Sequence, residues 1–144
     1  MHQSQPQKPP LGLTAVAVFL FFGALMASLA AITLTFPGTF LDYAWRLNPA
    51  AYAQLSPLGA PIGIVFFLLA AALAAAATGW VRRRRWGWTL AVIIIATQVV
   101  GDFANLLRGD VLRGAVGVTI AGALLFYMTR PRVRAAFGAR AAAP

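Results

Sequence analysis

An aspartate within an apolar stretch is the strongest candidate for chemistry in this chain. Gln98 and Asn105 flank Asp102 at about one helical turn on either side, so the three polar side chains share one face of the predicted helix. A charged aspartate in hydrocarbon costs about 2.5 to 3.5 kcal/mol at the midplane and less near the interface, so it needs a partner, a proton or local water. Arg113, in the next apolar run, is a candidate partner. The group predicts a small polar or proton-binding site, or polar contacts that pin two helices together.

A second polar group follows the first apolar run. Pro37 and Gly38 end that run, and Thr39 stands three residues before Asp42, the spacing of a reciprocal helix cap. Asp42 precedes Arg46 by four residues, which is the favourable order for a helical ion pair. We therefore expect a cap and an ion pair in a short helix here.

The sequence predicts two further helix starts. Asn48 precedes Pro49, which is typical of an N-cap followed by proline at the first helical position. Asp110 follows Gly109 and precedes another apolar run, so we expect it to cap a helix, with Arg113 as a surface partner. As a cation site, the three aspartates of the chain would offer few oxygen ligands beside several arginines, and no metal site is expected.

Four consecutive arginines separate the second apolar run from the third. They either hold this connection in the cytoplasm by the positive-inside rule or bind anionic lipid head groups. The net charge of +9 is spread along the borders of apolar runs, which favours the membrane surface over nucleic acid as the partner. The residues concerned are Arg82, Arg83, Arg84 and Arg85.

The chain has few residues that could act as a catalytic nucleophile, acid or base. The chain has no cysteine, and its one histidine, His2, lies in a polar tail. The hydroxyl side chains within the apolar runs lack a basic partner and can bond to the preceding helical turn. We expect no catalytic residue and no cofactor; no histidine in the apolar runs is available to hold haem. A set of aromatic residues is compatible with a pigment or quinone pocket but is more typical of packing or lipid-facing bulk: Phe19, Phe21, Phe22, Phe66 and Phe67.

The elements that position these residues are four apolar runs, over residues 11–36, 61–81, 86–107 and 111–129. With 60% hydrophobic and 10% charged residues, the composition indicates lipid as the solvent. Runs of about 19 to 26 residues cover the roughly 30 Å of a hydrocarbon core when helical. The fold class predicted is all-α: an integral membrane four-helix bundle.

Charge predicts how this bundle is oriented. The arginine run and the basic segment 130–144 would lie on one side, and the connections that carry the three aspartates on the other. The positive-inside rule then makes both termini cytoplasmic. Residues 1–10 read as a disordered tail, and the first run is too long for a typical signal peptide. Between the first and second spans, Tyr43, Trp45 and Tyr52 favour a short helical segment at the membrane interface.

Several segments resemble a group of small uncharacterised bacterial four-helix inner-membrane proteins. The similar residues are the stretch 36–42 with Trp45, Leu47, Asn48 and Pro49, the arginine run with Trp86, Gly87 and Trp88, and the group Gly101, Asp102 and Asn105. The resemblance spans most of the chain and implies a bacterial inner (plasma) membrane location. It implies no activity, because such proteins carry no assigned one.

These observations favour a non-catalytic membrane protein, an accessory, assembly or interaction subunit. Stripes of small residues such as Ala71, Ala75 and Gly79 would dock it against a second copy or another membrane protein. The alternative is a small oligomeric transporter or channel with a polar outer vestibule around Asp102, since four helices are few for a complete pathway. A membrane enzyme is the third hypothesis and has the least support in the residues.

Overall fold

The computed structural model describes residues 11–138, and this part of the chain is helical without strands. The prediction of a disordered tail at 1–10 lies outside these residues. Four helices are long and apolar enough to cross a membrane, which confirms the predicted all-α class and its four candidate spans. The second of them follows two short helices, from which it is separated by a bend at Gly59, whose φ is 57°. The elements are α1 (Leu11–Thr35), η1 (Phe40–Leu47), α2 (Pro49–Leu55), η2 (Ser56–Leu58), α3 (Gly59–Val81), α4 (Arg85–Leu107), α5 (Val111–Thr129) and α6 (Pro131–Gly138).

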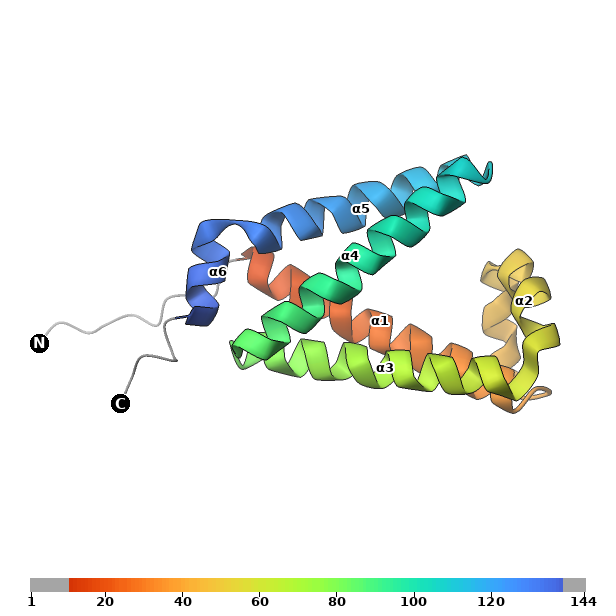
Figure 1. Cartoon of the computed structure of the whole chain (residues 1–144). Helices are drawn as coiled ribbons and strands as arrows, with labels where there is room; N and C mark the ends of the chain where they lie inside the picture. The colour runs from red at the N-terminus through yellow and green to blue at the C-terminus, as the bar shows by residue number, and fades with distance from the viewer. Residues whose placement is uncertain (1–10, 139–144) are drawn as a thin grey trace, which may run out of the picture.

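The four long helices form two pairs. Helix α1 packs along α3, and α4 packs along α5, while α3 and α4 meet mainly near the turn that joins them. From that turn the two pairs diverge, so that they are far apart where α2 lies (Figure 1). We call the end with the arginine turn and α6 the hairpin end, and the other the open end. The bundle is therefore closed at the hairpin end and splayed at the open end.

Small residues set the close approach within each pair. A stripe on α1 that includes Leu20, Ala24 and Ala27 is buried against α3. On α5, Gly114 lies so close to α4 that an added Cβ would stand 2.6 Å from the backbone nitrogen of Leu106. Such contacts are typical of helix association in lipid, where backbones approach through small side chains. Close packing of small residues therefore holds each pair together.

The turn between α3 and α4 is tight, because only the arginine run separates the second apolar run from the third. Its backbone closes with a hydrogen bond from the Arg84 N–H to the Gly79 carbonyl at 2.8 Å, and Arg83 adopts a positive φ of 52°. Directly beyond the turn, Gly79 and Gly87 touch backbone to backbone, and a Cβ on Gly87 would overlap Gly79. Of the expected small-residue stripe, Gly79 is buried in this crossing, whereas Ala71 is exposed. The stripe therefore serves packing within the chain at only one of its ends.

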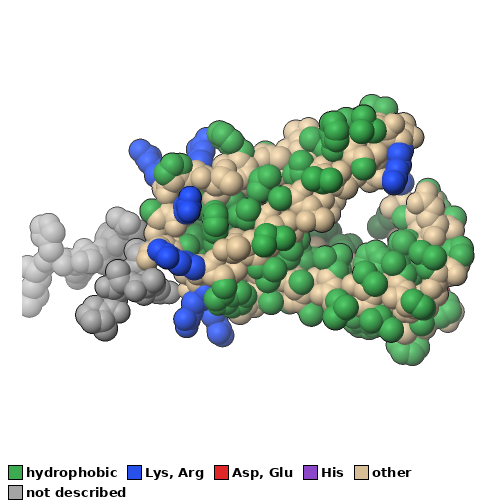
Figure 2. Space-filling view, viewed as in Figure 1, with side chains coloured by type: hydrophobic (Ala, Val, Ile, Leu, Met, Phe, Trp, Pro, Cys, Tyr) green, Lys and Arg blue, Asp and Glu red, His purple; other side chains and the backbone are tan. Residues whose placement is uncertain are grey.

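Tryptophans and α6 complete the hairpin end. The Trp80 indole N–H donates to the Leu13 carbonyl at 2.9 Å, and the Trp88 indole N–H donates to the Met128 carbonyl at 3.0 Å. Helix α6 buries Val133 and Phe137, and the Phe137 ring packs on Trp80 with centroids 4.6 Å apart. The segment 130–144 is therefore a packed helix up to residue 138, not only a basic tail. Most of the basic side chains visible in Figure 2 gather around this end, and others lie at the far end of the α4–α5 pair.

Candidate functional site

The divergence of the helix pairs leaves a cleft between them. It consists of two adjoining cavities of about 610 and 450 Å³ that share Phe19 and Gln98. One wall is built by α1, α3, η1 and α2, and the other by α4 and α5. The space-filling view shows the hollow between α2 and the far end of the α4–α5 pair (Figure 2). Its lining includes Phe19, Phe22, Met26, Trp45, Phe66, Ile94, Gln98, Asp102, Val116 and Ile120.

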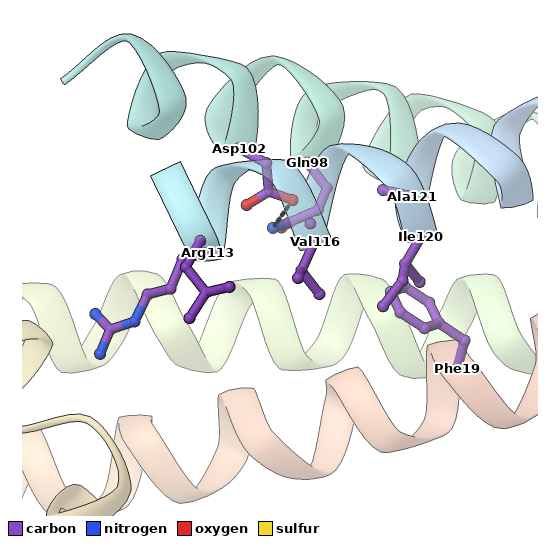
Figure 3. A pocket seen from close by; sticks show the side chains of 9 residues that line it. Phe19, Gln98, Asp102, Arg113, Val116, Ile120 and Ala121 are labelled. Carbon is purple, nitrogen blue, oxygen red and sulfur yellow. Dashed lines mark hydrogen bonds between the residues drawn. The ribbon is translucent and has the colours of Figure 1, made fainter. Parts of the chain in front are cut away.

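Asp102 brings a carboxylate to the wall of this cleft. Its side chain is 9% exposed and accepts a hydrogen bond from Gln98 Nε2 at 3.0 Å (Figure 3). Both residues belong to α4, one turn apart, so this bond lies within a single helix. Around the carboxylate the same cavity is lined by three apolar residues of α5, Leu112, Val116 and Ile120, and by Arg113. The site is thus a nearly buried acidic group in apolar surroundings.

Gly117 makes room for this carboxylate. An added Cβ at position 117 would overlap the Asp102 carboxylate, whereas an added Cβ at Gly122, also on α5, would have no atom within 4 Å. The sequence analysis did not identify Gly117 as a candidate site residue. Glycine fits at position 117 because the carboxylate of Asp102, on the adjacent helix, occupies the space that a side chain would need. No sequence pattern predicts this contact between α4 and α5.

Arg113 does not pair with Asp102. Its guanidinium lies 3.6 Å from the Asp110 carboxylate and, in the close-up, points away from Asp102 (Figure 3). The predicted surface pair of Asp110 with Arg113 is confirmed, and Asp110 stands at the N-cap position without a side-chain cap bond. Asn105 is exposed and takes no part in the bond of Gln98 to Asp102. Within the described residues, therefore, none of these side chains bonds α4 to α5, and the predicted polar pin is absent.

The group at Thr39 differs from the expected capping box and ion pair. The Asp42 carboxylate accepts from the Gly38 N–H at 2.7 Å, and the Thr39 hydroxyl lies 3.5 Å from the same carboxylate instead of capping η1. Arg46 lies over the Tyr43 ring at 3.7 Å rather than beside Asp42. The element is a 3-10 helix, whose three-residue turn takes positions four apart out of register.

The segment η1–α2 covers part of the cleft, and we call it the lid. Asn48 caps α2 as predicted, with its Oδ1 accepting from the Ala51 N–H at 3.2 Å. The Trp45 indole N–H donates to the Thr33 hydroxyl of α1 at 2.9 Å, and Thr33 is fully buried. Since Trp45 and Asn48 also line the larger cavity, this bond fixes the lid to α1.

The structure places the four arginines at the hairpin end, away from the cleft. Arg82, Arg84 and Arg85 are exposed, and Arg83 is half-buried in the turn. Their exposure leaves them accessible to lipid head groups, which stays a prediction.

For catalysis and metals, residues 11–138 contain no group of three or more His, Cys, Asp or Glu able to hold a metal ion. The hydroxyls behave as the sequence predicts, each bonding to its own helix: Thr97 donates to the Ile93 carbonyl at 2.9 Å and Thr119 to the Ala115 carbonyl at 2.7 Å. These hydroxyls therefore have their bonding satisfied locally and do not face a base.

The aromatic residues divide between two roles. Phe19, Phe22 and Phe66 line the cleft, while Phe21 and Phe67 are exposed outside it. The sequence favoured packing or lipid contact for all five. Helical spacing alone does not tell these roles apart, because the cleft wall and the lipid surface are both apolar.

In comparisons with known proteins, no protein-family model, curated protein or solved structure matches the chain.

Proposed function

We propose that this chain is a non-catalytic membrane protein, an interaction subunit that binds an apolar or amphipathic component of the bilayer in the cleft between its helix pairs. The observation that carries the proposal is the cleft itself, formed because α1 and α3 diverge from α4 and α5. Its cavities of about 610 and 450 Å³ fall within the range of about 300 to 1,000 Å³ typical of small-ligand sites.

The composition of the lining supports the same proposal. Apolar side chains dominate, and the polar groups are few: Asp102 with its donor Gln98, Arg113 and Asn48. Pockets that bind small molecules combine these features, an apolar body for affinity and a few polar groups for orientation. A catalytic set would require a nucleophile and a base within hydrogen-bonding reach of each other.

A photo-crosslinking pair tests the binding proposal. Met26 lines the cleft and is 41% exposed, whereas its neighbour Leu25 is 62% exposed and does not line it. With benzoylphenylalanine at position 26, we expect irradiation in native membranes to give a discrete adduct by mass spectrometry. Position 25 should give only a mixture that reflects the bulk lipids. Identical adduct patterns at the two positions would contradict a selective cleft.

We further propose that the hairpin end faces the cytoplasm of a bacterial cell, with both termini inside and η1 and α2 at the outer interface. The support is the charge distribution: the four arginines of the turn and those of α6 lie at one end. Arginines near an anionic leaflet contribute on the order of 1 kcal/mol each, which favours binding of anionic lipids there.

Cysteine labelling tests this orientation, since the chain has no cysteine of its own. An impermeant maleimide applied to intact cells should label Thr39→Cys, which is exposed beside η1. It should label Arg84→Cys, exposed in the hairpin, only after the membrane is opened. Labelling of position 84 in intact cells would reverse the topology.

A transporter or channel is the second candidate, favoured by one observation, the Asp102 carboxylate in the cleft wall. Such a protein would form an oligomer in the membrane. Asp102→Asn should then abolish flux in reconstituted vesicles, while an interaction subunit would show no flux before or after the change.

A further inference from the structure

We propose that the ligand of the cleft is a lipophilic organic monocation, whose charge pairs with Asp102 and whose apolar groups contact Phe19. This inference rests on the proposed binding function and names the chemical class of the ligand. Figure 3 shows the two residues entering the cavity from different helices, Phe19 from α1 and Asp102 from α4.

The electrostatics of the carboxylate carry the argument. In the described part of the chain, Asp102 has a single hydrogen-bond donor, Gln98 Nε2, and no Arg or Lys nitrogen within 4 Å. The charge of the nearest candidate, Arg113, is engaged by Asp110 at 3.6 Å. A carboxylate in apolar surroundings is best compensated by an opposite charge with close contact. A bound cation would supply that charge, which the described residues do not.

The shape and lining of the cavity select the kind of cation. The space beside Asp102, about 450 Å³, is bounded mainly by apolar residues such as Leu112, Val116 and Ile120. The Gln98 amide and Arg113, which is paired with Asp110, are the other polar groups there, so a strongly hydrated metal ion would find few oxygen ligands. Phe19 adds an aromatic ring to the same space, and aromatic rings attract organic cations. The cavity is also small for a partner helix, whose diameter with side chains is about 10 Å or more. A compact lipophilic cation satisfies both the charge and the apolar walls.

Tetraphenylphosphonium and tetraphenylborate provide a matched pair of probes, because they share size and shape and differ in the sign of their charge. Equilibrium dialysis of the purified full chain in neutral detergent micelles, corrected with empty micelles, measures both. We expect the unmodified chain to bind the phosphonium at least about tenfold more tightly than the borate. Asp102→Asn should remove this preference by weakening phosphonium binding about tenfold or more.

Two glycine variants on α5 refine the test. Gly117→Ala places a methyl group against the Asp102 carboxylate and should displace it, weakening phosphonium binding. Gly122→Ala adds the same methyl group where nothing lies within 4 Å, so phosphonium affinity should stay unchanged. If Asp102→Asn does not fold, the phosphonium and borate comparison on the unmodified chain still decides the question.

Equal affinity for phosphonium and borate, or unchanged phosphonium affinity in a folded Asp102→Asn protein, would overturn the cationic ligand. The discrete adduct at position 26 would then still support a neutral or anionic ligand, and the proposed function would survive. Failure of both the adduct and the probe preference would remove the binding function as well.

Discussion

Trp80→Ala should lower the free energy of unfolding by about 3 to 5 kcal/mol, the range for truncating a buried tryptophan. Trp80 is 2% exposed, and its indole N–H bonds to the Leu13 carbonyl at 2.9 Å. Its ring also packs against Phe137 of α6. The change therefore removes the contact that joins α3, α1 and α6 at once. Reversible unfolding in mixed micelles, followed by circular dichroism, measures the effect.

Phe103→Ala is the matched control, since Phe103 is a large aromatic residue of α4 that is 51% exposed. Its truncation should cost less than about 1 kcal/mol, because few protein contacts are lost. Trp80→Phe should fall between the two, since it keeps most of the ring but loses the indole donor. Equal stabilities for Trp80→Ala and Phe103→Ala would show that the hairpin end does not hold the bundle together.

Gly87→Ala should destabilise the bundle by about 1 to 3 kcal/mol, the range for overpacking a well-packed contact. The added methyl group would overlap the backbone of Gly79 on the facing helix, and a backbone cannot rotate out of the way as a side chain can. Alanine is otherwise the better helix former by about 1 kcal/mol, so the expected loss is net of that gain. Helices α3 and α4 would have to separate just beyond their tight turn.

Gly101→Ala isolates the clash from helix propensity. Gly101 lies on the same helix as Gly87, but an added Cβ would have nothing within 4 Å. This variant should be neutral or more stable by up to about 1 kcal/mol in the same unfolding measurement. If the Gly87→Ala and Gly101→Ala proteins had the same free energy of unfolding, the close contact between α3 and α4 at Gly87 would be contradicted.

Both large effects concentrate at one end of the molecule, and this bears on how the cleft would work. The hairpin end is joined by the glycine crossing, two tryptophan hydrogen bonds and α6. At the open end, the pairs are linked through the chain but lie apart. A ligand that touches both walls would bridge the α1–α3 pair and the α4–α5 pair. Binding would then limit their relative motion without disturbing the hairpin end.

Local sequence patterns were sufficient to predict the helices and where they begin and end. Apolar runs of sufficient length, bounded by proline, glycine and arginine, predicted four spans whose limits differ from the observed helices by about two residues or fewer. The Asn48 cap, the pair of Asp110 with Arg113 and the tight arginine turn were also readable. These features depend on residues within a turn or two of one another, so their partners are visible in the sequence.

Only the tertiary structure decided which helices pair, and therefore where the cleft lies and what lines it. In lipid, an apolar side chain gains little by facing protein instead of acyl chains, so apolar patterns do not mark the packed face. Glycine contacts between distant positions mark it instead, as at Gly87 with Gly79 and at Gly117 with Asp102. For the same reason the sequence did not show that Phe19 lines the cleft, because the cleft wall and the lipid-facing surface are both apolar.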